Sequence, residues 1–271
     1  GSSLFCCALP HSDLVIEARE VLGAGQFPIR KMPARIATLQ QVTDDVMIVT
    51  LQLPNTEQLK YQAGQYLEFL LRDGTRRSYS IANAPDTEAR LTLHIRHMAG
   101  GVFTDQVFST MKERDILRFE APLGTFFLRE DSDKPMVLLA SGTGFAPIKA
   151  LIEQSIQLGS KRPITLYWGG RRPRDLYLDA LCQEWARELP HFRYVPVVSD
   201  ALTEDGWHGR RGFVHLAVLD DFPDLSTYQV YACGAPIMVE SAKRDFAALC
   251  HLPEEEFYAD SFTSQADLAV V

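Results

Sequence analysis

A stretch of cationic, aromatic and hydroxyl residues, RRSYSIANAP at positions 76–85, is the first part of this sequence that could do chemistry. Arg77, Tyr79 and Ser80 offer a guanidinium, a flat ring and a hydroxyl within four residues. A guanidinium binds phosphate well, and an aromatic face accepts another ring. The flanking pattern indicates a β-strand, so the stretch predicts a strand that binds a flat, anionic ligand.

A glycine-rich turn offers a second binding possibility. In ASGTGFAPIKAL, Gly142 and Gly144 let the main chain turn tightly and approach a ligand, and Pro147 stands where a helix begins. The free amides and the positive dipole end of a helix start bind anions. An ordinary strand-to-helix turn would look the same, so these residues alone leave both interpretations open. The position favours a nucleotide site, because this is the first such turn in a region of alternating strands and helices.

Three weaker signals lie elsewhere in the chain. GGVFTDQV places two glycines before Thr104, a good helix N-cap, with Asp105 in the first turn. This predicts a capped helix and, together with RRSYS, a second phosphate cradle. YACGAP places Cys233 at a strand end, although a lone cysteine is more often a small core residue than a reactive group. FYADSF surrounds Asp260 with aromatic residues, which usually serve packing.

The segments around these stretches predict two domains of different character. Up to about residue 131, short alternating strands are separated by turns, and one helix is expected at about residues 104–115. This pattern is typical of an antiparallel β-barrel. Afterwards strand and helix alternate four times, which is typical of a doubly wound parallel sheet. The expected division is a remnant and linker at 1–31, a β-barrel domain at 32–131 and an α/β domain at 132–271.

Composition limits the possible classes of protein. A chain of 271 residues with 46% hydrophobic and 23% charged residues can form two globular domains. The net charge of −8 argues against a nucleic-acid partner, and no apolar run approaches the ~18 residues of a membrane helix. No signal-peptide pattern stands at the N-terminus. The five scattered cysteines argue against a disulfide framework and predict a reducing, cytoplasmic setting.

Four short motifs, in this order and spacing, resemble the ferredoxin–NADP⁺ reductase family: R-S-Y-S, G-G-x-x-T, A-S-G-T-G-x-A-P and C-G-A-P. The resemblance covers about residues 33–262, nearly the whole chain. It implies that the barrel binds a flavin and that the parallel-sheet domain binds a nicotinamide nucleotide. It also answers why RRSYS is so dense in functional groups, since a flavin nucleotide is flat and anionic.

The same resemblance implies roles for single residues. Arg77 would pair with the flavin phosphate, Tyr79 would lie against the isoalloxazine ring, and Ser80 would hydrogen-bond near its N5. The further residues implied for the flavin are Ser78, His94, Ile95, Gly100, Gly101, Val102 and Thr104. Those implied for the nicotinamide nucleotide are Gly142, Thr143, Gly144, Pro147, Arg171, Cys233, Gly234 and Phe262. The implied catalytic residues are Ser80, Cys233, Asp260 and Phe262, the last as a cover over the flavin face that receives hydride.

The first residues resemble a different module. LFCCALPHSDLVIE is similar to the end of a plant-type [2Fe-2S] ferredoxin domain, with Cys6 in the place of the last cluster ligand and Pro10 four residues later. Such a cluster needs four thiolates, and the C-x₄-C-x₂-C run that would supply three is missing. Cys6 would therefore be a metal ligand only with the rest of that domain present. A coincidental cysteine in a tail is the alternative.

Longer stretches, including HIRHMAGGVFTDQVF and YWGGRRPRDLY, resemble CDP-6-deoxy-Δ3,4-glucoseen reductase-like iron–sulfur flavoproteins. That resemblance implies an NAD(P)H-dependent reductase that takes hydride onto FAD and passes single electrons through a [2Fe-2S] centre to a deoxysugar dehydrase. The reductase component of an aromatic-ring oxygenase, a free flavin reductase and a non-catalytic docking module are the alternatives. The GGVFT cradle favours bound FAD over an exchanging flavin, and FMN stays the less favoured alternative to FAD. Arg171, Arg172 and Arg174 could read a 2′-phosphate, but Asp175 beside them would repel one, which favours NADH slightly over NADPH.

Overall fold

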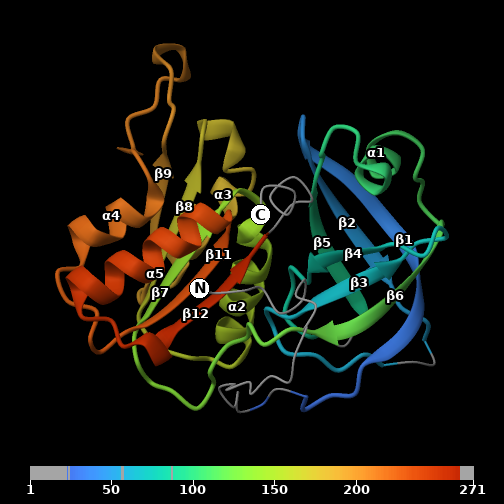
Figure 1. The fold of residues 1–271 in the computed structure, drawn as a ribbon, viewed down its shortest axis with the longest axis horizontal. Coiled ribbons are helices and arrows are strands. Elements are labelled where there is room, and N and C mark those ends of the chain that lie inside the picture. Colours follow the sequence, from blue (N-terminus) through green and yellow to red (C-terminus); the bar gives the residue numbers. More distant parts are fainter. Residues whose placement is uncertain (1–22, 24, 56–57, 87, 263–271) are drawn as a thin grey trace, which may run out of the picture.

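The computed structural model describes residues 23, 25–55, 58–86 and 88–262, and these form two bodies joined by the segment near residue 131 (Figure 1). The first body holds only antiparallel strands and one helix, and the second holds parallel strands flanked by helices. Cys6 lies outside the described residues, so its assignment as a cluster ligand stays a prediction.

The first body is a six-stranded antiparallel sheet curled around its own core. Alternation sets its inner face: Met32, Ala34 and Ile36 are buried while the residues between them are exposed. An isolated bridge between Ile81 and Leu93 brings the two edges of the sheet together. Its strands are β1 Arg30–Thr43, β2 Val46–Gln52, β3 Tyr66–Leu70, β4 Arg76–Ser80, β5 Arg90–Arg96 and β6 Ile116–Leu123, in the order β4-β3-β6-β1-β2-β5. The predicted antiparallel barrel is confirmed.

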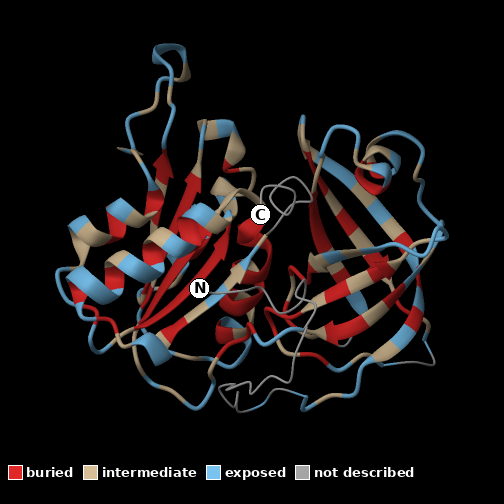
Figure 2. Cartoon of the chain, viewed as in Figure 1, coloured by how far each residue is buried: buried red, intermediate tan, exposed pale blue. Residues whose placement is uncertain are grey.

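The second body is a parallel sheet in the order β10-β9-β8-β7-β11-β12. Its strands are β7 Met136–Ser141, β8 Ile164–Gly170, β9 Phe192–Val198, β10 Arg210–Arg211, β11 Gln229–Gly234 and β12 Phe257–Ser261. The central strands are buried along their length, as Figure 2 shows, because helices cover both faces. Helices α2 Phe145–Gln157 and α3 Asp179–Glu188 pack on one face, and α4 Val214–Asp221 and α5 Pro236–Cys250 pack on the other. The predicted doubly wound α/β domain is confirmed.

Two helix starts differ from the sequence prediction. Helix α1 Val102–Ser109 begins after Gly101 rather than after Thr104, and it ends before the predicted residue 115. Thr104 is therefore not an N-cap, because its hydroxyl is inside the helix and bonds the carbonyl of Met98 at 3.0 Å. Pro147 is the third residue of α2 rather than the first, because a single turn of 3-10 helix at Gly142–Gly144 precedes that helix. Three other short 3-10 turns lie at Pro173–Asp175, Thr203–Asp205 and Glu254–Glu256.

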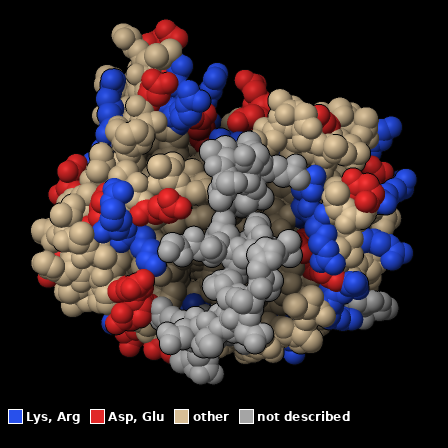
Figure 3. All heavy atoms as spheres, in the orientation of Figure 1, with Lys and Arg blue, Asp and Glu red and all other residues tan. Residues whose placement is uncertain are grey.

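The order of the parallel strands marks where a ligand is expected. β7 is the first strand of its sheet, and its two neighbours, β8 and β11, lie on opposite sides of it. The chain therefore reverses its direction of winding at β7, and ligands of such sheets bind at the carboxyl ends of the strands at that point. Figure 1 shows helix α2, which follows β7, on the side of the sheet nearer the barrel. Charged side chains of both signs are spread over both bodies in the view of Figure 3.

Candidate cofactor and nucleotide site

Strand β4 presents its residues to two sides, because successive side chains of a strand point to opposite faces. Tyr79 is half-buried, and its ring lies 5.9 Å from Phe69 and 5.6 Å from Phe103, centroid to centroid. Burial raises the pKa of Tyr79 well above its usual range, so the phenol stays neutral. Arg77 lies on the same face, and its Nη1 donates a hydrogen bond to the carbonyl oxygen of Arg76 at 2.7 Å. A ring fixed by packing and a guanidinium with further donors suit a flat, anionic ligand.

Ser78 and Ser80 lie on the other face of β4 and have different surroundings. Ser78 is exposed, and its hydroxyl donates to Glu68 Oε1 at 3.2 Å. Its side chain is therefore used on the outer surface of the barrel. Ser80 is only 7% exposed, and its hydroxyl lies close enough to the carboxyl of Asp260, on β12 of the other domain, to lower the pKa of that carboxyl. Of the two serines, the structure places Ser80 at the domain junction.

The start of α1 forms a cradle open to an anion. Gly100 has φ +79°, and a Cβ on Gly101 would lie 2.6 Å from Thr104 Oγ1 and 2.9 Å from the carbonyl oxygen of Met98, so neither position tolerates a side chain. The first helical bond runs from the amide of Asp105 to the carbonyl of Gly101. The amides at 102–104 therefore precede the helix ladder and are available to a phosphate. The cradle, with the Tyr79 ring of β4, suits a flavin nucleotide.

Three groups that can hold protons meet where the domains join. Cys233 on β11 pairs in the sheet with Asp260 on β12 and with Ala140 on β7. Burial raises the pKa of Asp260 to about 6, and the bond from Ser80 offsets part of that rise. Burial, and then the nearby Asp260 carboxylate, raise the pKa of Cys233 well above its usual range. The thiol is therefore neutral and the carboxyl titrates close to neutrality, as a group that delivers or holds a proton must.

The carboxyl ends of β7 and β11 are packed so closely that only glycine fits there. A Cβ on Gly144 would lie 2.2 Å from the carbonyl oxygen of Cys233, and a Cβ on Gly234 would lie 2.1 Å from Ser141 Oγ. The carbonyl of Gly142 is held by Trp168 Nε1 at 3.0 Å. This turn, with Thr143 at its centre, leads into the amide-rich start of α2, as the sequence predicted for a dinucleotide site.

Phe262 lies next to this turn. Its amide donates to the carbonyl of Gly234 at 2.9 Å, and its ring packs against the core of the parallel sheet. Pro147 is buried inside α2, so it shapes the helix start rather than facing a ligand. The structure therefore gathers the predicted Ser80, Cys233, Asp260 and Phe262 around one junction.

Two residues predicted for the cofactor use their side chains elsewhere. Ile95 is 1% exposed and lies in the barrel core. His94 is 5% exposed, and its Nδ1 lies 2.9 Å from the hydroxyl of Tyr177 in the other domain. Burial, with the nearby charge of Lys149, lowers the pKa of His94 to about 3, so the ring is neutral. Its Nε2 is enclosed with no hydrogen-bond partner among the described residues, so this nitrogen is still available to a ligand, whereas Ile95 could offer a cofactor only its main chain.

The predicted adenosine end of the site carries balanced charges. Arg171 is exposed, with its guanidinium 3.9 Å from Asp200. Arg172 forms a two-pronged contact with Asp205, with both nitrogen–oxygen distances at 2.7 Å. Asp175 accepts the amides of Arg171 and Arg172 at 2.8 and 2.9 Å, so its carboxylate closes the turn. Arg171 and Arg172 are therefore already opposed by acidic groups.

Arg96 lies in the site although the sequence analysis did not single it out. A Cβ on Gly142 would lie 3.2 Å from the guanidinium of Arg96, whose Nε is 3.4 Å from Asp45. This cation reaches from the end of β5 to the dinucleotide turn of the other domain. Its position at a strand end just before the glycine pair is the signal that could have revealed it.

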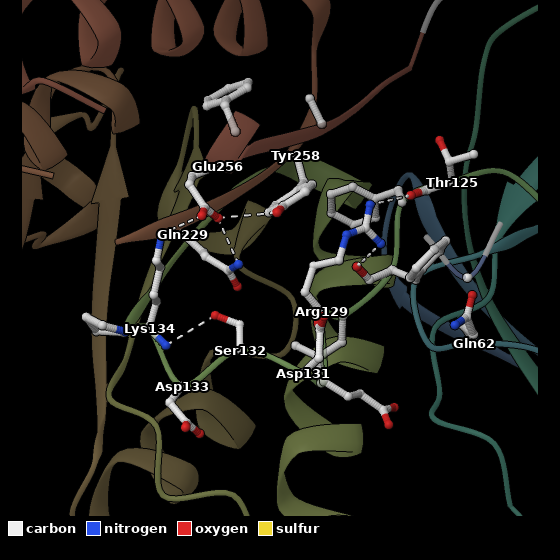
Figure 4. A pocket seen from close by; sticks show the side chains of 18 of the residues that line it. Gln62, Thr125, Arg129, Asp131, Ser132, Asp133, Lys134, Gln229, Glu256 and Tyr258 are labelled. Carbon is white, nitrogen blue, oxygen red and sulfur yellow. Dashed lines mark hydrogen bonds and ion pairs between the residues drawn. The ribbon is translucent and has the colours of Figure 1, made fainter. Parts of the chain in front are cut away.

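A cavity of about 1020 Å³ opens at the opposite end of the parallel sheet (Figure 4). It is lined by the connecting segment and by the amino ends of β7, β11 and β12. Arg129 lies between the rings of Phe127 and Tyr258, at 4.0 and 4.5 Å from their centroids, and Lys134 pairs with Glu256. None of the predicted site residues lines it. Several of its polar groups bond to one another, among them Lys134, Gln229 and Tyr258, which all contact Glu256.

Within the described ranges, no group of three or more His, Cys, Asp or Glu residues could hold a metal ion, and Cys182, Cys233 and Cys250 are free thiols. In the same part of the chain, every helix is too short or too polar to cross a bilayer.

Comparison with known proteins decides the family. Residues 33–128 match the oxidoreductase FAD-binding domain, and residues 138–244 match the oxidoreductase NAD-binding domain. The chain belongs to the ferredoxin reductase-type oxidoreductases. The predicted FAD-binding and NAD-binding domains, and the prediction of an oxidoreductase, are thereby confirmed.

Individual relatives of this ferredoxin reductase-type chain serve different partners. It is 41% identical to the CDP-6-deoxy-L-threo-D-glycero-4-hexulose-3-dehydrase reductase of Yersinia pseudotuberculosis, over 97% of this chain and 78% of that protein. It is 34% identical to reductase component 1 of the terephthalate 1,2-dioxygenase of a Comamonas species, over 96% of this chain and 77% of that protein. Among solved structures, the cytochrome P450 reductase GcoB of Amycolatopsis superposes with a TM-score of 0.81 at 34% identity, covering 88% of this chain and 71% of that one. The resemblance drawn from the four motifs is confirmed.

Proposed function

We propose that this chain oxidises NADH or NADPH, holds FAD in its barrel, and supplies single electrons to a [2Fe-2S] centre and then to a partner enzyme of the deoxysugar dehydrase type. The junction of Ser80, Asp260 and Cys233 beside the dinucleotide turn carries this proposal. The similarity to a dehydrase reductase supports the choice of partner. The similarity to a dioxygenase reductase supports the second candidate, an aromatic-ring oxygenase partner. We also propose the domain limits 1–31, 32–131 and 132–271.

The barrel residues bind and orient the flavin in this proposal. When bound, FAD supplies the chemistry of accepting two electrons with a hydride and releasing them one at a time. Arg77 and the amides at 102–104 would neutralise its phosphates, and Tyr79 would support its ring. Gly100 and Gly101 keep side chains out of the cradle. These contacts favour retained FAD over an exchanging flavin, and over a docking module without a cofactor.

The junction residues hold and move protons. Ser80 would place its hydroxyl near the flavin N5, with the Asp260 carboxyl beside it as a group that can hold a proton. Cys233 is neutral and buried, so we assign it to shaping the nicotinamide position rather than to nucleophilic attack. Phe262, tied to Gly234 through its amide, would cover the site and exclude water until the nicotinamide arrives.

The charges at the adenosine end lead us to propose NADH as the preferred donor. A 2′-phosphate needs a cation with free donors, whereas Arg172 is held by Asp205 and Arg171 faces Asp200. Added negative charge would therefore meet Asp200 and Asp205 as well as the arginines. We also propose a cytoplasmic location, because five scattered cysteines argue against a disulfide framework.

The visible absorption spectrum of the purified protein tests the proposed function directly. We expect a yellow protein with a flavin absorption band near ~450 nm that bleaches on anaerobic addition of NADH. Acid release of the cofactor, followed by chromatography, separates FAD from FMN. A colourless protein that does not take up FAD when it is added would refute the proposal and favour a docking module.

A further inference from the structure

Helix α2 of the α/β domain forms hydrogen bonds with the barrel at residues 82–84, the segment that follows β4. Lys149 Nζ donates a hydrogen bond to the carbonyl oxygen of Ala82 at 3.0 Å. The carboxylate of Glu153 accepts the amide of Ala84 at 3.1 Å, and Lys149 pairs with Glu153 one turn along the helix. One ion pair thus holds both a carbonyl and an amide of the other domain's main chain.

Residues 82–84 are themselves hydrogen-bonded to other parts of the barrel. The amide of Ala82 donates to the carbonyl of Thr92 at 2.7 Å. The side chain of Asn83 accepts the amide of Thr92 at 2.7 Å and donates to the carbonyl of Arg90 at 3.1 Å. Residues 82–84 are therefore fixed to β5 by these hydrogen bonds. A displacement of this segment would displace the strand as well.

Both ends of this contact lead to the proposed reaction site. Ala82 follows Ser80 by two residues, and Lys149 follows Gly144 by five residues on the helix that continues the dinucleotide turn. We propose that Lys149 and Glu153 are positioning residues, which set the separation between the Ser80 hydroxyl and the dinucleotide turn. The inference rests on the hydride transfer proposed above and identifies what aligns its two halves.

The surroundings make this contact stiff. The Lys149 side chain is 13% exposed and that of Glu153 is 28% exposed, so water screens the pair weakly. Hydrogen bonds to charged groups are stronger than those between neutral groups. Loss of the lysine would leave the Ala82 carbonyl without this donor and the Glu153 carboxylate without its cation. The domains would then settle differently, and a displacement of about 1 Å between reacting groups lowers a rate by roughly 100-fold.

The test compares Lys149→Met with Lys149→Arg and with a matched control. Methionine keeps the length and the apolar stem of lysine but removes the charge and the donors. Arginine keeps both charge and reach. The control is Lys243→Met on α5, which removes another helix lysine that pairs with an acid, Glu254 at 2.9 Å, on the side of the sheet away from α2. Each protein is loaded with FAD and reduced anaerobically by NADH in a stopped-flow instrument, with flavin content and Tm measured alongside.

We expect Lys149→Met to lower the limiting rate of flavin reduction roughly 10- to 100-fold, with NADH affinity within about threefold of the unchanged protein. The long-wavelength absorbance that a stacked nicotinamide and flavin produce should weaken as well. Lys149→Arg should recover most of the rate, and Lys243→Met should match the unchanged protein. An unaltered limiting rate in Lys149→Met would overturn the inference, as would a loss that Arg does not recover. If the unchanged protein is itself not reduced by NADH, the proposed function fails first and the inference falls with it.

Discussion

Gly144→Ala is a sharp test of the geometry at the dinucleotide turn, because nothing except close packing opposes it. Gly144 has φ −58° and ψ −12°, which alanine adopts readily, so conformational preference alone would make the substitution stabilising. Its Cβ, however, would lie 2.2 Å from the carbonyl oxygen of Cys233. A carbon and a carbonyl oxygen approach to about 3.3 Å, so the two strand ends must separate by about 1 Å.

The cost follows from that displacement. Forcing extra volume into a packed site destabilises by about 1–3 kcal/mol, which corresponds to a fall in Tm of roughly 3–10 °C for a chain of this size. The start of α2 would move with Gly144, so we expect KM for NADH to rise about tenfold, the equivalent of about 1.4 kcal/mol of binding. Flavin content should not change, because the cradle lies in the barrel.

The measurements are thermal unfolding and steady-state reduction of ferricyanide by NADH. Gly159→Ala is the control: it lies just beyond the end of α2, has φ +64°, and nothing lies within 4 Å of its Cβ. It should lose about 1 kcal/mol through backbone strain and leave KM unaltered. If Gly144→Ala shows a Tm and a KM indistinguishable from those of the unchanged protein, the close approach of β7 and β11 is not what shapes the site.

Three further predictions concern the junction and the choice of donor. Ser80→Ala should slow flavin reduction roughly 10- to 100-fold, the scale of losing one positioned donor, and an unchanged rate of stopped-flow bleaching would remove Ser80 from the mechanism. Because burial raises the pKa of Asp260 from 3.8 to about 6, folding binds a proton there, so this group's stabilising contribution is present below about pH 4 and is lost as pH rises through 6. Asp260→Asn should therefore reduce the loss of stability between pH 4 and 7, by up to about 2–3 kcal/mol of unfolding free energy at pH 7. Thermal unfolding as a function of pH measures this, and a pH profile like that of the unchanged protein would contradict the assignment. The ratio of kcat/KM for NADH to that for NADPH should exceed about 10, and Asp205→Asn, which releases Arg172, should lower it; a preference for NADPH in the unchanged protein would refute the charge argument.

The sequence predicted the fold because its two halves obey different periods. Alternation along residues 46–52 predicted a half-buried strand of the barrel, and the unbroken apolar run at 136–140 predicted a buried strand of the parallel sheet; both predictions are confirmed. The helix starts were placed wrongly for a local reason. Thr104 has the chemistry of an N-cap, but the glycines before it let the helix begin earlier, and its hydroxyl then bonds to Met98.

The site was predicted less evenly than the fold. Ser80, Cys233 and Asp260 stand in recognisable motifs, and the structure brings them together. The role of Lys149 could not be predicted from the sequence, because this residue acts on the other domain and spacing along one domain carries no information about that contact. For His94, which the resemblance assigns to the cofactor, the sequence could not reveal that Nδ1 bonds to Tyr177 of the other domain.

The proximity of Ser80 and Asp260 has a consequence for any attempt to separate the two domains. The Ser80 hydroxyl belongs to the barrel, and the Asp260 carboxyl belongs to β12, the last described strand of the α/β domain. Each domain alone therefore supplies only one of the two groups. A barrel domain produced alone could still bind flavin, but Ser80 would then lack the neighbouring carboxyl of Asp260 when the flavin is reduced. Flavin binding and flavin reduction by NADH would then be separable properties. Different truncations of the chain would remove one without the other.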